Sequence, residues 1–263
     1  MIEVVKICKY NEVYARIECE PSTAMEIAER FTFMVPGAKF SPMYKNKLWD
    51  GKIRIFNPMN RLLYIGLIPE LENLCNSRKY HIEYEIENAD IEFSLHEAEK
   101  FVKALEPKYE PRDYQYEAFV HAIRKRRALL LSPTGSGKSL IIYLLTRYYN
   151  TKTLIIVPTT SLVSQMSSDF LSYGYDDTDN IHKIYSGQEK YGSQQIFIST
   201  WQSIYKLPKE WFNQFNLIIG DEAHLFKSKS LIEIMTKLHH AKYRFGFTGT
   251  LDGTQTHKWV LEG

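Results

Sequence analysis

A loop in the middle of the chain joins glycine, lysine and serine in an order suited to phosphate binding. Residues 132–139 read Ser-Pro-Thr-Gly-Ser-Gly-Lys-Ser directly after an apolar run. Gly135 and Gly137 allow positive φ angles and a close approach of backbone N–H groups to phosphate oxygens. A helix starting near Lys138 would add the positive end of its dipole. The loop therefore predicts nucleotide binding.

The individual loop positions have expected partners. We expect Lys138 to bind the β- and γ-phosphates of ATP and Ser139 to ligate Mg²⁺. The residues expected to surround the nucleotide are Pro133, Thr134, Gly135, Ser136, Gly137, Lys138 and Ser139. The general pattern begins with glycine, where this chain has Ser132. A plain glycine turn between a strand and a helix is the structural alternative.

Two adjacent carboxylates end another apolar run. Residues 217–224 read Leu-Ile-Ile-Gly-Asp-Glu-Ala-His. In a parallel α/β sheet, ligands collect beyond the carboxyl ends of the strands. We therefore expect Asp221 beside the magnesium and Glu222 beside the γ-phosphate, where it can orient and deprotonate water. A surface turn would explain the pair taken alone, and the phosphate loop favours the catalytic interpretation.

Short apolar segments alternating with amphipathic helices must position these residues. The segments are Leu129–Leu131, Thr153–Val157, Ile196–Thr200, Leu217–Ile219 and Arg244–Phe247. Their apolar centres are typical of strands buried on both faces of a parallel sheet. From about residue 106 to 263, the sequence therefore predicts an α/β domain with a parallel sheet.

Residues 1–105 predict a small α+β domain. Strands are expected at Ile2–Ile7, Val13–Ile17, Lys52–Phe56, Leu62–Ile65 and Tyr80–Ile86, and the third and fourth are expected to pair around the turn at residues 57–60. Helices are expected at Thr23–Phe33 after a Ser22 cap, at Pro69–Asn76 and near Ser94–Leu105. Pro107 and Pro111 place the domain boundary near residue 106.

The order of several motifs resembles a known family. Residues 221–224, Asp-Glu-Ala-His, resemble the DEAH form of motif II in superfamily-two helicases, and residues 132–139 resemble their motif I. Residues 112–115, 158–165, 199–203 and 248–250 resemble further motifs in the same order, although Gly249 stands where the family has alanine. The resemblance covers roughly residues 110–251. It implies a RecA-like P-loop domain.

The resemblance also implies roles for residues outside the loop. Arg112 and Gln115 would lie at the adenine. Residues that would contact one nucleic-acid strand are Thr159, Gln165 and Thr200. His224, with Thr248 and Thr250, would couple the nucleotide site to the nucleic-acid site. Without the resemblance, helix capping would be the preferred explanation for the threonines.

A basic segment in the first domain predicts contact with DNA. Its cations are Lys39, Lys45, Lys47, Lys52, Arg54 and Arg61, against the single acid Asp50, and Trp49 is one of the interleaved aromatic residues. Cations neutralise phosphates and aromatic rings stack on exposed bases. A solvated hairpin whose aromatic side chains belong to the core is an equal alternative.

Residues 33–67, 200–202 and 208–212 are similar to phage recombination DNA helicases of the UvsW type. This resemblance implies an ATP-dependent DNA helicase acting on forks, Holliday junctions and R-loops in recombination, replication and repair. It also implies branched or duplex DNA as partner. An RNA helicase or a restriction-type translocase subunit is one alternative. A non-motor nucleotide-dependent DNA-binding module is another.

Chain length and composition set further expectations. The family's motor has a second RecA-like lobe, for which 263 residues leave no room, so we expect a fragment that hardly turns over ATP alone. The net charge of +2 does not by itself indicate nucleic acid. Three separated cysteines and the lack of a long apolar run predict no disulfide framework and no membrane span. We expect a soluble cytoplasmic protein, in an infected bacterial host by the resemblance.

Overall fold

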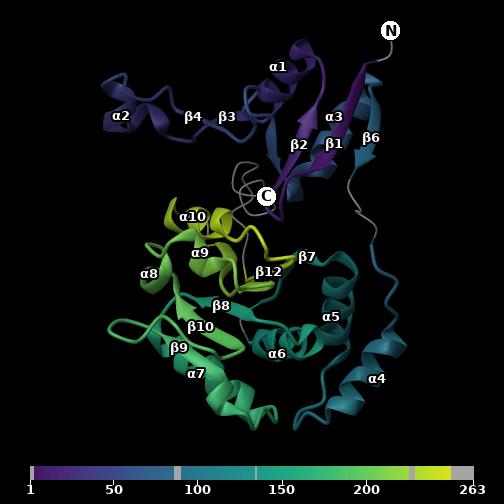
Figure 1. Cartoon of the computed structure of the whole chain (residues 1–263), viewed down its shortest axis with the longest axis vertical. Coiled ribbons are helices and arrows are strands. Elements are labelled where there is room, and N and C mark those ends of the chain that lie inside the picture. The colour runs from purple at the N-terminus through teal and green to yellow at the C-terminus, as the bar shows by residue number, and fades with distance from the viewer. Residues whose placement is uncertain (1–2, 86–89, 134, 225–228, 250–263) are drawn as a thin grey trace. The chain divides into compact units, whose positions relative to one another are not determined.

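In a computed structural model, the protein is described over residues 3–85, 90–133, 135–224 and 229–249. Backbone contacts divide it into two compact units, which we call unit 1 and unit 2 and which meet in sequence at Asn88 and Ala89. Figure 1 shows the elements of each unit. The predicted fold class is confirmed, because a small α+β unit precedes an α/β unit with a parallel sheet.

The compact units divide upstream of the boundary predicted near residue 106. The helix α4 (Leu95–Leu105) begins with a capping box, in which Ser94 and Glu97 bond to each other's backbone N–H groups. It packs against α5 (Asp113–Lys125) through the stacked rings of Phe101 and Phe119, so it belongs with unit 2. The division into functional domains at residue 106 stays a prediction.

Unit 1 is built on a four-stranded sheet with the order β5-β2-β1-β6. Strand β1 pairs antiparallel with β2 and parallel with β6. Alternate residues of β1, Val5 and Ile7, are fully buried, so one sheet face forms the core with the two longer helices. The elements are β1 (Val4–Lys9), β2 (Tyr14–Glu18), α1 (Pro21–Arg30), β3 (Thr32–Met34), η1 (Ala38–Phe40), α2 (Pro42–Lys45), β4 (Lys52–Arg54), β5 (Leu62–Tyr64), η2 (Ile65–Leu67), α3 (Ile68–Arg78) and β6 (His81–Glu85).

Two local predictions in unit 1 are wrong. The segments near residues 52–56 and 62–65 do not pair with each other: β4 pairs with β3, and β5 pairs with β2. Phe56 and Leu63 both lie in the core, so the chain between them does not form the turn of a hairpin. Ser22 does not cap α1, because the helix begins one residue earlier at Pro21, a residue suited to the first helical position.

The described strands of unit 2 form a six-stranded sheet with the order β7-β12-β11-β8-β10-β9, and all its pairings are parallel. The elements besides α4 and α5 are β7 (Arg127–Leu131), α6 (Lys138–Tyr149), β8 (Thr153–Val157), α7 (Thr160–Ser172), η3 (Thr178–Asn180), β9 (Ile181–Ile184), β10 (Ile196–Thr200), α8 (Trp201–Ile204), α9 (Lys209–Phe212), β11 (Leu217–Gly220), α10 (Lys229–Lys237) and β12 (Tyr243–Thr248).

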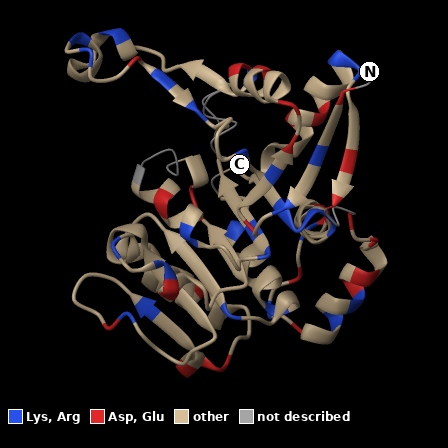
Figure 2. Cartoon of the chain, turned by 45° about the horizontal axis from the view of Figure 1, so that its top comes forward, with Lys and Arg blue, Asp and Glu red and all other residues tan. Residues whose placement is uncertain are grey.

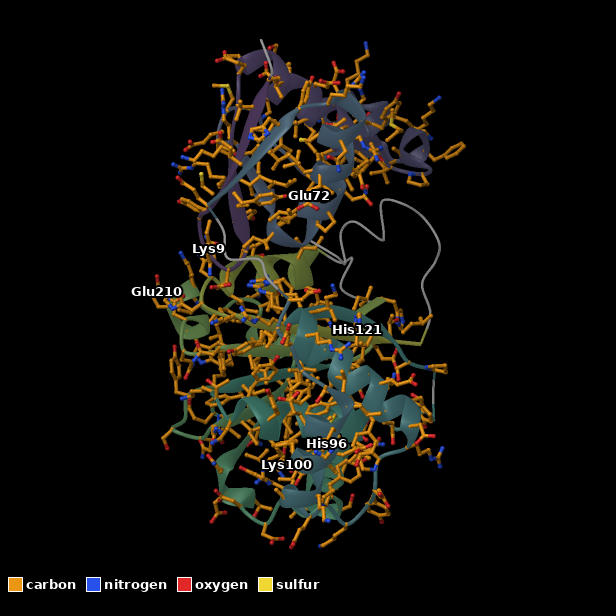
Figure 3. The ribbon with its side chains drawn as sticks, turned by 90° about the vertical axis from the view of Figure 1, so that its right-hand side faces the viewer. Lys9, Glu72, His96, Lys100, His121 and Glu210 are labelled. Atoms are coloured by element: carbon orange, nitrogen blue, oxygen red, sulfur yellow. The ribbon has the colours of Figure 1, made fainter. Side chains whose placement is uncertain are left out.

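Both faces of this sheet are covered, and for this reason every residue of the interior strands β8, β10 and β11 is buried. In β8, Ile155 and Val157 join the apolar cluster that includes residues of α5, α6 and α7. Leu154 and Ile156 join the other cluster, with residues of α9 and α10. Successive strand residues point to opposite faces, so one continuous apolar run serves two cores. Figure 3 labels His96 and Lys100 on α4 and His121 on α5. Among the described residues, no helix is long and apolar enough to cross a bilayer.

Candidate functional site

The phosphate-loop sequence lies between β7 and α6, as predicted. Gly135 and Gly137 have φ angles of +80° and +74°, and α6 begins at Lys138. The Ser132 N–H donates to the Thr248 carbonyl at 2.7 Å, which ties the start of the loop to β12. The first N–H groups of a helix have no intrahelical acceptor, so the loop and the helix start can together surround an anion.

Ser132 has a structural use at the position where the general pattern has glycine. Its hydroxyl lies 2.6 Å from the Ser136 hydroxyl, within hydrogen-bond distance across the loop. Pro133 is exposed, and Thr134 lies outside the described residues. The departure from the strict pattern therefore adds a cross-loop bond.

Gln115 is almost fully buried against the loop. Its Nε2 donates to the carbonyl oxygens of Ser136 at 3.1 Å and Gly137 at 3.2 Å. Its Oε1 accepts from the Arg112 N–H at 2.9 Å. The Tyr114 hydroxyl, which the sequence did not indicate, also donates to the Ser136 carbonyl at 2.9 Å. This geometry braces the loop from α5, and the adenine contacts of Arg112 and Gln115 stay predictions.

The two predicted carboxylates meet the loop lysine. Lys138 Nζ donates to the Glu222 carboxylate and lies 3.4 Å from Asp221 Oδ1. Asp221 directly follows β11, and its N–H donates to the Ile156 carbonyl at 2.9 Å. Glu222 has a φ of +53°, which is uncommon for a residue with a side chain. Three groups predicted from two distant segments therefore form one charged cluster.

Burial and neighbouring charges shift the pKa values of this cluster in opposite directions. Burial raises the pKa of Asp221, while the positive charge of Lys138 acts to lower it. Burial acts to lower the pKa of Lys138, but the bond to Glu222 and the attraction of both carboxylates outweigh it, so that pKa is raised. The raised pKa keeps Lys138 charged.

His224 connects this cluster to the neighbouring strand. Its Nδ1 lies 3.0 Å from the Thr248 hydroxyl and 3.3 Å from Glu222 Oε2. The Thr248 carbonyl in turn accepts from the N–H of Ser132. A continuous polar path therefore runs from the second carboxylate to the start of the phosphate loop. The coupling role of these residues stays a prediction, and Thr250 lies outside the described residues.

Ser139 has a partner that the sequence did not reveal. Its hydroxyl lies 2.6 Å from the Tyr173 hydroxyl, and it also hydrogen-bonds Asp169. Burial raises the pKa of Asp169, and the bond from Ser139 partly opposes that shift. The Tyr173 ring meets the Tyr109 ring edge-on at 5.9 Å. No local pattern links residues 139 and 173, because only the packing of α6 against α7 brings them together.

Two of the residues predicted to contact a nucleic-acid strand lie at the ends of neighbouring β-strands, at the same sheet edge. Thr159 follows β8, and Thr200 is the last residue of β10. Thr159 caps α7, its Oγ1 accepting from the Leu162 N–H at 3.4 Å, which is the capping role considered above. Gln165 is exposed on α7. Thr200 is buried, with its hydroxyl 2.9 Å from that of Ser203. Their contacts with nucleic acid stay predictions.

The basic segment of unit 1 separates into free and engaged cations. Lys39, Lys45, Lys47 and Lys52 are exposed, and no ion pair joins them to an acid among the described residues. Arg54 pairs with Asp50, and the Arg61 guanidinium donates to the Cys19 carbonyl. Trp49 Nε1 donates to the Lys52 carbonyl at 3.0 Å. Part of the predicted set thus serves structure.

The donors at the loop fit a nucleoside triphosphate with Mg²⁺. A serine hydroxyl and an aspartate carboxylate are the hard oxygen ligands that Mg²⁺ accepts alongside phosphate oxygens. Glycine at residue 137 lets the loop backbone lie close to the Gln115 side chain, since a Cβ there would lie 2.4 Å from Gln115 Nε2. Lys138 would supply the cation for the phosphates. Ser139 and Asp221 are thus the residues that would hold the metal.

Comparison with known proteins finds relatives that match both units. The family described as "Type III restriction enzyme, res subunit" matches residues 108–253, and the family described as "DNA helicase UvsW, N-terminal" matches residues 4–85. The ATP-dependent DNA helicase uvsW of Enterobacteria phage T4 is 37% identical over 262 residues, which is 94% of this chain and 52% of that protein. The DNA 3'-5' translocase XPB2 of Sulfurisphaera tokodaii is 33% identical over 173 residues, which is 66% of this chain and 37% of that protein.

A solved structure extends the match to the fold. The crystal structure of the UvsW helicase from bacteriophage T4 matches with a TM-score of 0.90 and 34% identity, and the match covers 100% of this chain and 98% of that one. The chain spans about half the length of the phage T4 protein. A family whose members use nucleotide accounts for the loop and the two carboxylates. The chain belongs to the superfamily-two helicases, and among them to the UvsW family.

Proposed function

We propose that this chain is the ATP-binding part of a DNA helicase that remodels branched DNA in recombination, replication and repair. The observation that carries the proposal is the cluster in which Lys138 of the phosphate loop meets Asp221 and Glu222. The same sheet edge carries Thr159, which follows β8, and Thr200, the last residue of β10. A nucleotide site and a strand-contact site on one edge suit a motor that links ATP to DNA movement.

The residues of the cluster have complementary roles in this proposal. The loop N–H groups, the N-terminus of α6 and Lys138 hold the phosphates of ATP. Ser139 and Asp221 hold Mg²⁺, which when bound offsets the negative charge that develops on the phosphates. Arrival of ATP draws Lys138 from Glu222 to the phosphates. Glu222 is then free to orient a water molecule and accept its proton.

We propose that turnover also needs a second RecA-like lobe. This chain covers 52% of the phage T4 helicase, and an arginine finger supplied across the ATP cleft changes phosphoryl-transfer rates by roughly 10³–10⁵-fold. The chain alone would then bind ATP and hydrolyse it very slowly. DNA would not stimulate it, because stimulation requires both lobes to close.

Steady-state ATPase assays test this proposal. The rate is measured for this chain and for a full-length gene product that includes the second lobe, each with forked DNA, plain duplex and single-stranded RNA. We expect strong stimulation by forked DNA in the full-length protein and almost no turnover in this chain. Preferential stimulation by RNA would favour an RNA helicase. Stimulation by unbranched duplex alone would favour a restriction-type translocase. ATP-dependent DNA binding without turnover in the full-length protein would indicate a non-motor module.

A further inference from the structure

A serine hydroxyl joins the first turn of α6 to the end of α7. Ser139 is the second residue of α6 and directly follows the phosphate loop. Its hydroxyl lies 2.6 Å from the hydroxyl of Tyr173, the residue after α7, and it also hydrogen-bonds the carboxylate of Asp169 within α7. The side chain expected to ligate Mg²⁺ therefore has two partners from a different helix.

The Tyr173 hydroxyl is held in place by its own backbone and ring. The Tyr173 N–H donates to the Asp169 carbonyl at 3.0 Å, and the Tyr173 carbonyl accepts from the Lys108 N–H at 3.2 Å. The ring lies 5.5 Å from the Tyr143 ring and 5.9 Å from the Tyr109 ring, measured between centroids. Packing of α6, α7 and the segment before α5 thus fixes where this hydroxyl lies.

Asp169 is the one charged residue in α7, and the acidic residues of the chain are red in Figure 2. It is half-buried. A carboxylate withdrawn from water costs free energy unless hydrogen bonds replace the lost hydration. The Ser139 hydroxyl provides such a bond, and the positive end of the α6 dipole is favourable for a negative charge at this place. Asp169 is therefore suited to accept the Ser139 proton.

The proton and lone pairs of Ser139 can be assigned one by one. A hydroxyl has one proton and two lone pairs, and an ionised carboxylate only accepts. The Ser139 proton therefore goes to Asp169, and Tyr173 donates its own proton to Ser139 Oγ. Among the residues that the structure describes, this leaves one lone pair of Ser139 Oγ without a partner. A lone pair on a neutral oxygen is what a serine offers to Mg²⁺.

We propose that Asp169 and Tyr173 position the Ser139 hydroxyl so that one of its lone pairs is kept for Mg²⁺. This inference rests on the proposed ATP site and extends it to α7. Neither residue is assigned a contact with the nucleotide, so both act through Ser139 as positioning residues. Hydrogen-bond partners of a metal ligand orient it, and their loss lowers metal affinity by about 10–100-fold.

ATP binding to this chain, titrated once with excess Mg²⁺ and once with EDTA, tests the proposal without relying on turnover. Asp169→Asn and Tyr173→Phe keep the shape of each side chain and weaken or remove its bond to Ser139. We expect each variant to lose about tenfold in affinity for ATP with Mg²⁺ and nothing in EDTA. The Mg²⁺ concentration needed for half-maximal ATP binding should rise by about the same factor.

A double-mutant cycle shows whether the two residues act through Ser139. Ser139→Ala removes the hydroxyl and should itself lower the ATP affinity with Mg²⁺. Adding Tyr173→Phe or Asp169→Asn to Ser139→Ala should then lower it no further, because the shared partner is gone. Tyr175→Phe is the matched control. Tyr175 is buried and its hydroxyl bonds Asn180, so its loss should change neither affinity.

The remaining outcomes separate this inference from the proposed function. Equal losses with Mg²⁺ and with EDTA, or additive losses in the Ser139→Ala background, would make these side chains a plain tie between α6 and α7 and overturn the inference. Unchanged affinities in both single variants would overturn it as well. Thermal unfolding should show the variants folded, and each single variant tests the inference independently of the other.

The wild-type chain provides the last comparison. If it binds ATP equally with Mg²⁺ and with EDTA, the positioning role is refuted while the nucleotide site stands. If it binds no ATP under either condition, the proposed function fails together with the inference.

Discussion

The side-chain amide of Gln115 lies where a side chain at residue 137 would have to lie. A Cβ added to Gly137 would be 2.4 Å from Gln115 Nε2, whereas nothing lies within 4 Å of a Cβ added to Gly135. Both glycines have positive φ. Glycine is therefore needed at residue 135 for its backbone angle alone and at residue 137 for its angle and for space.

This difference predicts unequal costs for two similar substitutions. Gly135→Ala should lower the free energy of unfolding by about 1 kcal/mol, the usual penalty for alanine at positive φ. Gly137→Ala should cost about 1–3 kcal/mol more, because of the clash with Gln115. Denaturant unfolding of both variants measures the difference. Adding Gln115→Ala to Gly137→Ala should recover part of the loss, and no recovery would show that the clash is relieved in another way.

Gln115 itself has two possible uses that nucleotide affinity distinguishes. If the amide mainly braces the loop, Gln115→Ala should weaken ATP and GTP binding by the same factor, about tenfold for the loss of two buried hydrogen bonds. If the amide reads adenine, ATP affinity alone should fall. We expect equal losses, since Nε2 already donates to two loop carbonyls. Calorimetric titration of both nucleotides decides between these uses.

Lys138→Ala should abolish detectable ATP binding without unfolding unit 2. The phosphates lose their cation, and Asp221 and Glu222 are left adjacent without a positive charge between them. We expect the free energy of unfolding to fall by about 1–3 kcal/mol from that unpaired, mostly buried charge. Lys125→Ala removes an exposed lysine paired with Asp90 and should change neither property. Unchanged ATP affinity in Lys138→Ala would refute the assignment of the loop.

Thr248→Val tests the path from Glu222 through His224. Valine matches threonine in shape but removes the hydroxyl that lies 3.0 Å from His224 Nδ1. Loss of one buried hydrogen bond should cost about 1 kcal/mol of stability. ATP affinity of the chain should change little, and DNA stimulation of ATPase in the full-length protein should fall by at least tenfold. Equal stimulation in the variant would remove Thr248 from the coupling path.

Cys75 should be the least reactive of the three thiols. It is buried in the core of unit 1, and burial raises its pKa to about 11 from an ordinary 9.0. The folded thiol therefore stays protonated as pH rises from 9 to 11, while the unfolded thiol ionises, so unit 1 should lose stability across that window and none below it. Labelling at pH 8 should modify Cys8 and Cys19 first. Cys75→Ser should leave that early labelling unchanged.

Much of unit 2 could be predicted because its signals are local. The strands at residues 153–157 and 196–200 have the predicted bounds, since a strand buried on both faces is an uninterrupted apolar run. The phosphate loop and the paired carboxylates were likewise recognisable from residue type and spacing. Unit 1 was harder, because β3, β4 and β5 have three residues each. Segments so short do not reveal which strand they pair with.

The sequence by itself determined the parallel sheet, the phosphate loop and the two carboxylates beyond it, because each depends on neighbouring residues. Only the tertiary structure decided which distant groups meet. It brought Gln115 to Gly137 and Ser139 to Tyr173, and it joined Arg61 to the Cys19 carbonyl. Such contacts depend on how helices and strands pack across tens of residues, and residue spacing carries no record of that packing.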